Sequence, residues 1–290
     1  RTQDIRYGDA ERQALDVFTP DEAPEDGARR AVIVFFYGGS WQRGSKESYR
    51  FVASQLAERG LVVVLPDYRL HPEVHFPAFV HDAADAVAWA LEHASEYGGD
   101  PERVFVMGHS AGAHLAALVH YDERFLDQAG ADRDPCGFIG LSGPYDFLPL
   151  VSPNLKKIFP SGSREESQPV RFVDGGEGPA LLIHGMQDDT VKPRNSASLA
   201  EAVRQAGGQA DLRIYDDLGH VATLLSLWEP LDFVAPTLED VLGFIERIGC
   251  EEPEPGTNRF LRCRCALFPG STGSEGSEGS EGTMPPPSSS

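Results

Sequence analysis

The stretch Gly108-His109-Ser110-Ala111-Gly112 decides how the rest of the sequence is interpreted. It follows the apolar run at residues 104–107 and precedes a helix-like stretch at residues 111–120. A Gly-x-Ser-x-Gly sequence between a strand and a helix is the pattern of a nucleophile elbow, a sharp turn that lifts the serine clear of the sheet. The two glycines fit because backbone segments crowd together at such a turn. The sequence therefore predicts that Ser110 is a nucleophile and that the Ala111 amide points toward its target.

Apolar runs alternate with amphipathic stretches along most of the chain. This alternation predicts an α/β fold with a mostly parallel sheet flanked by helices, because buried parallel strands are continuously apolar. We expect strands at residues 31–36, 61–65, 103–107, 138–141, 180–183 and 212–215. We expect helices at residues 46–59, 78–97, 111–120, 196–206 and 238–248.

Two regions depart from this alternation. Residues 144–178 are rich in proline, serine and charge, and long connections of this kind are usually functional or mobile. We expect a small cap-like insert there, beside the site. Residues 250–290 contain three Ser-Glu-Gly triplets and a Pro-Pro-Pro-Ser-Ser-Ser ending, which cannot form a core, so we expect a disordered tail. The expected organisation is one catalytic domain at residues 1–249 followed by this tail.

The composition limits the partners. The chain has 45 acidic and 25 basic side chains, a formal charge of −20. Such an acidic surface repels nucleic-acid phosphates, anionic lipids and strongly anionic substrates, so neither nucleic acid nor a membrane is an expected partner. No apolar run approaches the roughly 20 residues of a transmembrane helix. The compartment and the oligomeric state stay open.

A nucleophilic serine needs a base, which is itself held by a third group. After a nucleophile elbow the order along the chain is serine, acid, histidine. Asp188 follows the strand expected at 180–183, and His220 follows the next one, both at the sheet edge where such sheets bind ligands. The spacing Gly185-x-x-Asp188-x-x-Val191 favours Asp188 as the acid and His220 as the base. The weaker candidates for the acid are Asp189, Asp216 and Asp217.

The stretch Tyr37-Gly38-Gly39-Ser40-Trp41, here called the oxyanion loop, directly follows the strand expected at residues 31–36. Its small residues allow backbone amides to face a developing negative charge, and such preorganised donors contribute about 10²–10³ in rate. We predict that Gly39 and Ser40 supply these amides together with Ala111. A plain glycine turn would explain the loop taken alone, but the motifs downstream favour the functional interpretation.

Together these motifs resemble the α/β-hydrolase esterases that carry a His-Gly-Gly-x-Trp loop and a Gly-x-Ser-Ala-Gly elbow. The feruloyl-esterase-like carboxylesterases and the kynurenine formamidases are the most similar groups. The resemblance also includes Asp67-Tyr68-Arg69-Leu70 and Gly143-Pro144-Tyr145-Asp146. It implies the α/β-hydrolase fold. One position departs from the pattern, because the family's loop histidine is Tyr37 here, so Tyr37 must hold the loop in a different way.

The resemblance implies a carboxylesterase that cleaves small, uncharged esters of short acyl chains through an acyl-enzyme intermediate. A formamidase or peptidase using the same triad is one alternative, since the fold does not name the substrate. A catalytically inactive binding protein is another, against which the intact Ser110, Asp188 and His220 argue. We expect no cofactor and no metal, because the other histidines lack metal-ligand spacing. Substrate contacts are expected from Trp41, Tyr37, His109 and Tyr145.

Overall fold

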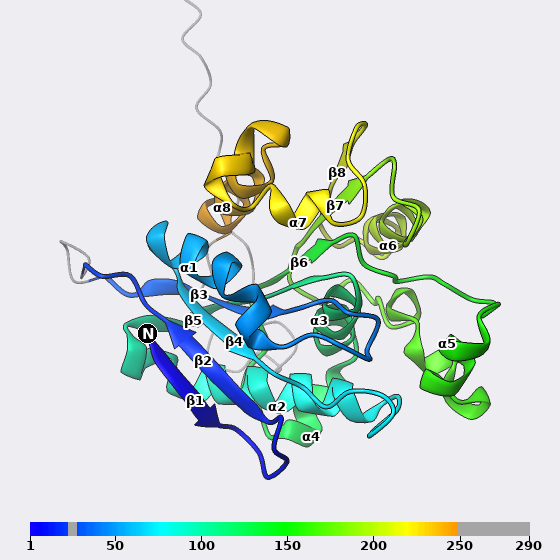
Figure 1. The fold of residues 1–290 in the computed structure, drawn as a ribbon, viewed down its shortest axis with the longest axis horizontal. Helices are drawn as coiled ribbons and strands as arrows, with labels where there is room; N and C mark the ends of the chain where they lie inside the picture. Colours follow the sequence, from blue (N-terminus) through cyan, green and yellow to red (C-terminus); the bar gives the residue numbers. More distant parts are fainter. Residues whose placement is uncertain (23–27, 249–290) are drawn as a thin grey trace, which may run out of the picture.

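One eight-stranded sheet forms the centre of the molecule, with the strand order β1-β2-β4-β3-β5-β6-β7-β8 (Figure 1). The computed structural model describes residues 1–22 and 28–248, and the tail expected at 250–290 lies outside these ranges. The strands are β1 (Thr2–Arg6), β2 (Ala14–Phe18), β3 (Arg30–Phe36), β4 (Val62–Pro66), β5 (Gly99–His109), β6 (Gly137–Leu141), β7 (Ala180–Gly185) and β8 (Ala210–Tyr215). Strands β4 to β8 pair in parallel, whereas β1 and β2 pair antiparallel. The predicted mostly parallel sheet is confirmed.

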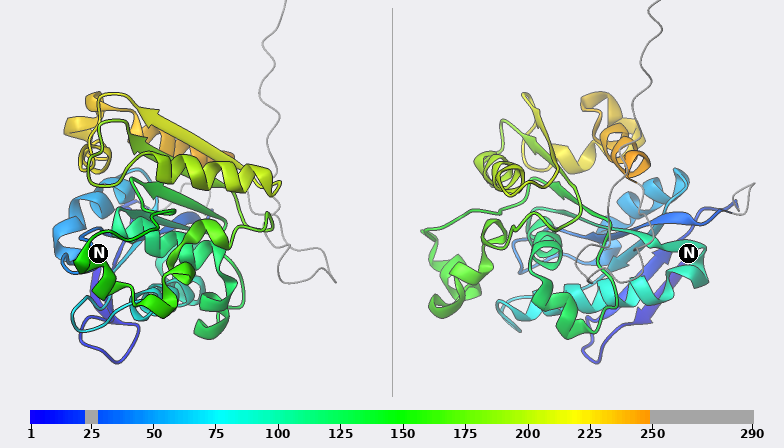
Figure 2. Two further views of the ribbon diagram at one scale, coloured as in Figure 1. Left: turned by 90° about the vertical axis from the view of Figure 1, so that its right-hand side faces the viewer. Right: turned by 180° about the vertical axis from the view of Figure 1, so that it is seen from behind.

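Helices cover both faces of the sheet. Figures 1 and 2 show α1 and α8 on one face and α2, α3 and α4 on the other. The α-helices are α1 (Arg50–Glu58), α2 (Ala78–His93), α3 (Ala111–Tyr121), α4 (Glu123–Ala129), α5 (Pro153–Ile158), α6 (Arg194–Gln205), α7 (Ala222–Leu225) and α8 (Thr237–Arg247). The 3₁₀ helices are η1 (Lys46–Tyr49), η2 (Ala94–Tyr97), η3 (Ser161–Ser163), η4 (Glu165–Ser167), η5 (Pro169–Arg171) and η6 (Glu229–Val234). In the described ranges, no helix is long and apolar enough to span a membrane.

The sequence analysis did not predict β1 and β2. All five residues of β2 are buried, but a charged residue, Asp16, interrupts its apolar run. Asp16 is accommodated by Lys46, whose Nζ lies 2.6 Å from Asp16 Oδ1, and both side chains are almost completely buried. The strand was missed because its central residue is neutralised by a partner 30 positions away in the sequence, which a local hydrophobic pattern does not register.

Backbone contact joins the start of α3 to the end of β3. A Cβ built on Gly112 would lie 2.0 Å from the carbonyl oxygen of Phe36. A Cβ on Gly108 would lie 2.4 Å from the carbonyl carbon and oxygen of Gly112. Both glycines of the predicted elbow are therefore required by backbone approaching backbone, and this contact places Ser110 beside the oxyanion loop.

The segment at residues 144–178 consists of short helices joined by irregular stretches. It contains α5 and the short helices η3, η4 and η5, and Figure 1 shows α5 at the right-hand edge of the molecule. Two of its aromatic rings pack on the indole of Trp41, with centroid distances of 4.8 Å for Phe159 and 6.2 Å for Phe147. The segment therefore packs against the oxyanion loop.

We expect Gly112→Ala to destabilise the protein by about 2 kcal/mol or more, since overpacking a tight backbone contact costs about 1–3 kcal/mol. Gly162→Ala is the matched control, because nothing lies within 4 Å of a Cβ at Gly162. Urea unfolding of the two purified variants measures the difference. An unchanged midpoint for Gly112→Ala would show that α3 and β3 separate easily.

Candidate active site

Ser110, His220 and Asp188 form one hydrogen-bonded chain at the carboxyl ends of three strands. Ser110 directly follows β5, Asp188 follows β7, and His220 lies between β8 and α7. The Ser110 Oγ lies 2.8 Å from His220 Nε2, and His220 Nδ1 lies 2.7 Å from Asp188 Oδ2. The competing acid, Asp189, is exposed and instead accepts a hydrogen bond from Lys192 Nζ at 2.6 Å. The structure thus joins by hydrogen bonds the three residues that the sequence analysis favoured.

Asp188 is almost completely buried and accepts hydrogen bonds on both oxygens. The amides of Thr190 and Val191 each donate to Oδ1 at 2.8 Å. The Nε2 of His184 lies 3.2 Å from Oδ2, the oxygen that faces His220. Burial alone raises the pKa of Asp188, but hydrogen bonds from His184, His220 and the Val191 amide outweigh it and hold the pKa well below its usual value. Asp188 is therefore an ionised carboxylate whose Oδ2 faces the Nδ1 of His220.

His184 is a positioning residue to which the sequence analysis gave no role. Its Nε2 lies 2.9 Å from the carbonyl oxygen of Val191 as well as near Asp188, so Nε2 carries the proton. Its Nδ1 then accepts from the Ser196 hydroxyl at 2.7 Å. These contacts fix the loop that carries the acid. The available signal was the His-Gly-x-x-Asp spacing at residues 184–188.

The backbone of Ser110 adopts φ 56° and ψ −122°, a conformation that side-chain-bearing residues rarely take. Such strain costs about 1–3 kcal/mol and persists only where the surroundings hold it. Here the Ser110 amide donates to Leu141 O at 2.9 Å, and the Ser110 carbonyl accepts from the His114 amide at 3.2 Å. The elbow is therefore held from β6 on one side and from α3 on the other.

The oxyanion loop turns sharply beside the nucleophile. Gly39, Ser40 and Trp41 have φ angles of 137°, 55° and 59°. In the described part of the chain, the amides of Gly39, Ser40 and Ala111 donate to no protein acceptor. A Cβ on Gly38 would lie 3.0 Å from Ser110 Cβ, so the loop passes directly beside the nucleophile. These amides remain available for a substrate oxygen.

Tyr37 anchors the oxyanion loop from the interior of the protein. Its hydroxyl donates to Asp67 Oδ1 at 2.7 Å and accepts from Arg12 Nη2 at 2.7 Å. Its ring stacks on Tyr68 at a centroid distance of 4.7 Å, and the Tyr68 hydroxyl donates to the Tyr37 carbonyl at 2.7 Å. Because Tyr37 is completely buried, the substrate contact expected from the sequence is replaced by a structural role.

Trp41 is also largely buried, with 5% of its surface exposed. Its Nε1 donates to His114 Nδ1 at 3.2 Å, and His114 Nε2 donates to the Ser167 carbonyl at 2.7 Å. Burial lowers the pKa of His114 to about 4, so this histidine is neutral and serves as both acceptor and donor. Trp41 therefore ties the oxyanion loop to α3 and to the 144–178 segment more than it faces a substrate.

His109 and Tyr145 complete the set of expected substrate contacts, and both are buried. His109 Nε2 donates to the His220 carbonyl at 3.0 Å and so holds the loop that carries His220. Burial, followed by the charge of His220, lowers the pKa of His109 to about 4. Tyr145 is completely enclosed, and its amide donates to Asn195 Oδ1 at 3.0 Å. His109 Nδ1 and the Tyr145 hydroxyl have no hydrogen-bond partner in the described structure, so the expected substrate contacts of these two residues stay predictions.

The chain is similar in sequence to known esterases. The family model described as BD-FAE matches residues 15–151, which include the oxyanion loop and the elbow. The probable isoprenylcysteine alpha-carbonyl methylesterase ICMEL1 of Arabidopsis thaliana is 31% identical over 251 residues, 78% of this chain and 52% of that protein. Esterase LipC of Mycobacterium tuberculosis is 29% identical over 220 residues, 69% of this chain and 54% of that protein. The chain spans about half the length of the curated relatives it matches.

A solved structure extends the match over the whole described fold. The native esterase Est2 of Thermogutta terrifontis, a Planctomycetes species, superimposes with a TM-score of 0.68 at 26% identity, covering 83% of this chain and 90% of that one. The chain shares the α/β-hydrolase fold with this esterase. The fold implied by the elbow and loop motifs is confirmed, and so is the resemblance to esterases of this fold.

For this α/β-hydrolase we expect Gly39→Val to lower ester turnover by on the order of 10²-fold or more, the loss of one oxyanion donor. The Gly39 φ of 137° disfavours a branched side chain, and a Cβ there would lie 2.0 Å from the Arg43 carbonyl oxygen. Tyr37→His, which restores the family residue, is the comparison variant and should keep substantial turnover. Turnover of Gly39→Val within twofold of the parent would place the donors elsewhere.

We expect Asp188→Asn to lower turnover by about 10⁴-fold, because an amide stabilises the wrong imidazole tautomer and cannot balance the imidazolium charge. Asp189→Asn is the matched control and should have a mild effect, since Asp189 is exposed and bonded to Lys192. Steady-state kinetics on a chromogenic acetate ester measures both variants. The reverse ranking would assign the orienting role to Asp189.

Proposed function

We propose that this protein is a serine esterase that hydrolyses small, uncharged carboxylic esters with short acyl chains. The observation that carries the proposal is the chain from Ser110 Oγ through His220 to Asp188, with distances of 2.8 and 2.7 Å. The free amides of Gly39, Ser40 and Ala111 beside Ser110 support it.

In the proposed acylation step, Ser110 Oγ attacks the ester carbonyl carbon while His220 Nε2 accepts the hydroxyl proton. The carbonyl oxygen becomes an oxyanion and accepts hydrogen bonds from the amides of Gly39, Ser40 and Ala111. Asp188 stabilises the positive charge that forms on the imidazole. His220 then gives its proton to the leaving alkoxide oxygen, the C–O bond breaks, and the alcohol departs from an acyl-Ser110 ester.

In the proposed deacylation step, water repeats the same sequence in the place of Ser110. His220 Nε2 takes one proton from the water as its oxygen attacks the acyl carbon. The second oxyanion collapses, the bond to Ser110 Oγ breaks, and His220 returns the proton to that oxygen. A carboxylic acid leaves, and the enzyme is restored without a cofactor.

The substrate class is supported by relatives and by the surroundings of His220. Structures of the Thermogutta terrifontis esterase are described with butyrate bound, with propionate bound and phosphonylated by sarin. Beside His220, Val221 is 53% exposed, and Trp228 in the following segment is 45% exposed. Apolar side chains next to the base, on a chain with a formal charge of −20, favour uncharged esters.

We also propose that residues 1–249 make up the catalytic domain and that residues 144–178 act as its cap. The triad and the oxyanion loop lie before residue 249, and the 144–178 segment packs on Trp41 through Phe147 and Phe159. Movement of this segment would then reach the oxyanion loop directly. A chain ending at residue 249 should keep the ester turnover of the full chain.

The test of the proposed function is a panel of chromogenic esters of increasing acyl length, with N-formylkynurenine and an aminoacyl anilide added. We expect the highest kcat/KM on short acyl esters and stoichiometric labelling of Ser110 by a fluorophosphonate. Ser110→Ala and His220→Ala should each lose nearly all turnover, because triad members act as a unit. A folded Ser110→Ala protein with substantial turnover, or preference for either amide, would overturn the proposal.

A further inference from the structure

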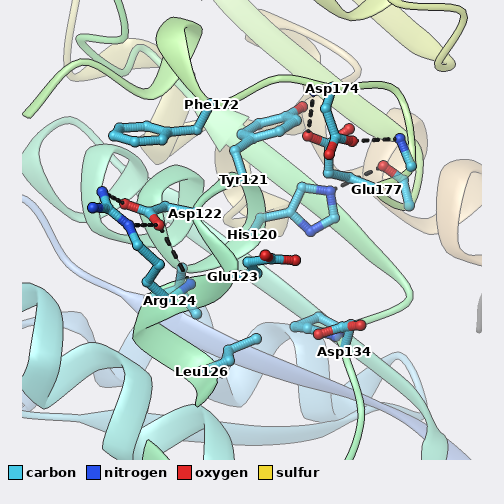
Figure 3. A pocket seen from close by; sticks show the side chains of 14 residues that line it. His120, Tyr121, Asp122, Glu123, Arg124, Leu126, Asp134, Phe172, Asp174 and Glu177 are labelled. Atoms are coloured by element: carbon cyan, nitrogen blue, oxygen red, sulfur yellow. Dashed lines mark hydrogen bonds and ion pairs between the residues drawn. The ribbon is translucent and has the colours of Figure 1, made fainter. Parts of the chain in front are cut away.

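A cavity of about 280 Å³ lies at the end of α3 that is farther from Ser110. Figure 3 shows side chains that line it. Its walls come from the end of α3, the start of α4 and the loop at residues 172–178. Because α3 has 11 residues, its last residue, Tyr121, lies about 15 Å along the helix from the nucleophile. The cavity is therefore separate from the active site.

The lining combines apolar surface with carboxylates. Phe172 and Leu126 supply apolar side chains, and Glu123, Asp174 and Glu177 supply acidic ones. Within the described ranges, no lysine or arginine forms an ion pair with Asp174 or Glu177. Their hydrogen-bond donors are backbone amides of their own loop, at 2.8–2.9 Å. Burial raises the pKa of Glu177 and outweighs the backbone hydrogen bonds that lower it.

Among the remaining charged residues of the lining, Arg124 and Asp122 cancel each other, and Asp134 is a further acidic residue. Arg124 donates to both oxygens of Asp122, through Nε at 2.8 Å and Nη2 at 2.7 Å. The guanidinium of Arg124 also lies 5.2 Å from the centre of the Phe172 ring. His120 donates from Nε2 to the Gly178 carbonyl at 2.9 Å, and burial lowers its pKa to about 4, so it is neutral. The net charge of the cavity is therefore negative.

Tyr121 supplies an independent sign of a ligand. Only 4% of its surface is exposed, and its hydroxyl has no hydrogen-bond partner in the described structure. Figure 3 shows this hydroxyl directed toward the side of the cavity formed by Asp174 and Glu177. Buried polar atoms are nearly always paired, so an orphaned hydroxyl in a cavity wall indicates a partner that enters from outside the chain.

We propose that this cavity binds a small organic cation, an ammonium group attached to a short apolar or aromatic body. The ammonium donates hydrogen bonds to the Tyr121 hydroxyl oxygen and to the carboxylates of Asp174 and Glu177, while the apolar body packs against Phe172. A carboxylate or phosphate ligand would meet uncompensated negative charge. A neutral ligand of the same shape would leave Asp174 and Glu177 without a counter-charge.

The experiment titrates the full chain, after Ser110 has been blocked with a fluorophosphonate, with 2-phenylethylammonium in an isothermal calorimeter. The matched probes are 2-phenylethanol, which has the same body without charge, and 3-phenylpropionate, which has the opposite charge. We expect one ammonium bound per chain, at least about tenfold more tightly than the alcohol, and no binding of the carboxylate.

Two variants locate the binding. Tyr121→Phe removes the orphaned hydroxyl without opening a hole and should weaken ammonium binding several-fold while keeping the melting temperature. Glu177→Gln should weaken it about tenfold or more, whereas Glu246→Gln, an exposed change on α8, should leave it unchanged. Equal affinity for ammonium and alcohol, absent ammonium binding, or ammonium binding unaffected by both Tyr121→Phe and Glu177→Gln would overturn the proposal.

Discussion

The backbone contact between Gly112 and Phe36 is the constraint on which the active site depends. No side chain fits between them, because a Cβ on Gly112 would lie 2.0 Å from the Phe36 carbonyl oxygen. The contact fixes the start of α3 against the end of β3, and Ser110 and the oxyanion loop are the next residues along these two elements. Their separation is therefore set by main-chain packing, which is stiffer than any side-chain contact.

Three buried histidines hold the other parts of the site. His184, His109 and His114 each direct Nε2–H at a backbone carbonyl, those of Val191, His220 and Ser167. A neutral imidazole suits this use because it offers one donor and one acceptor in fixed directions. The loop that carries Asp188, the loop that carries His220 and the 144–178 segment are each fixed in this way. His220 differs from these three because its Nε2 lies 2.8 Å from Ser110 Oγ, as the proposed role of a base requires.

The sequence predicted correctly those features that depend on a short stretch of residues. The elbow, the order of acid and histidine, and the central apolar strands are all short-range features, and the structure brings them together as predicted. The structural role of Tyr37 was not predictable, because Tyr37 resembles a binding residue until its complete burial is known. Strands β1 and β2 were hidden because Asp16 breaks the pattern and its partner, Lys46, is distant in sequence.

These two strands help to explain how Tyr37 can stand where the similar esterases have a histidine. The segment between them carries Arg12, which donates to the Tyr37 hydroxyl, to the Tyr68 carbonyl at 2.8 Å and to the Gly44 carbonyl at 2.8 Å. One guanidinium thus joins Tyr37 of the oxyanion loop and Gly44 just after it to Tyr68, which follows β4. In the described structure the Tyr37 hydroxyl is held by Arg12 and Asp67, both of which are distant from it in sequence. The antiparallel edge of the sheet is therefore part of the support of the oxyanion loop, although it contributes no residue to the triad.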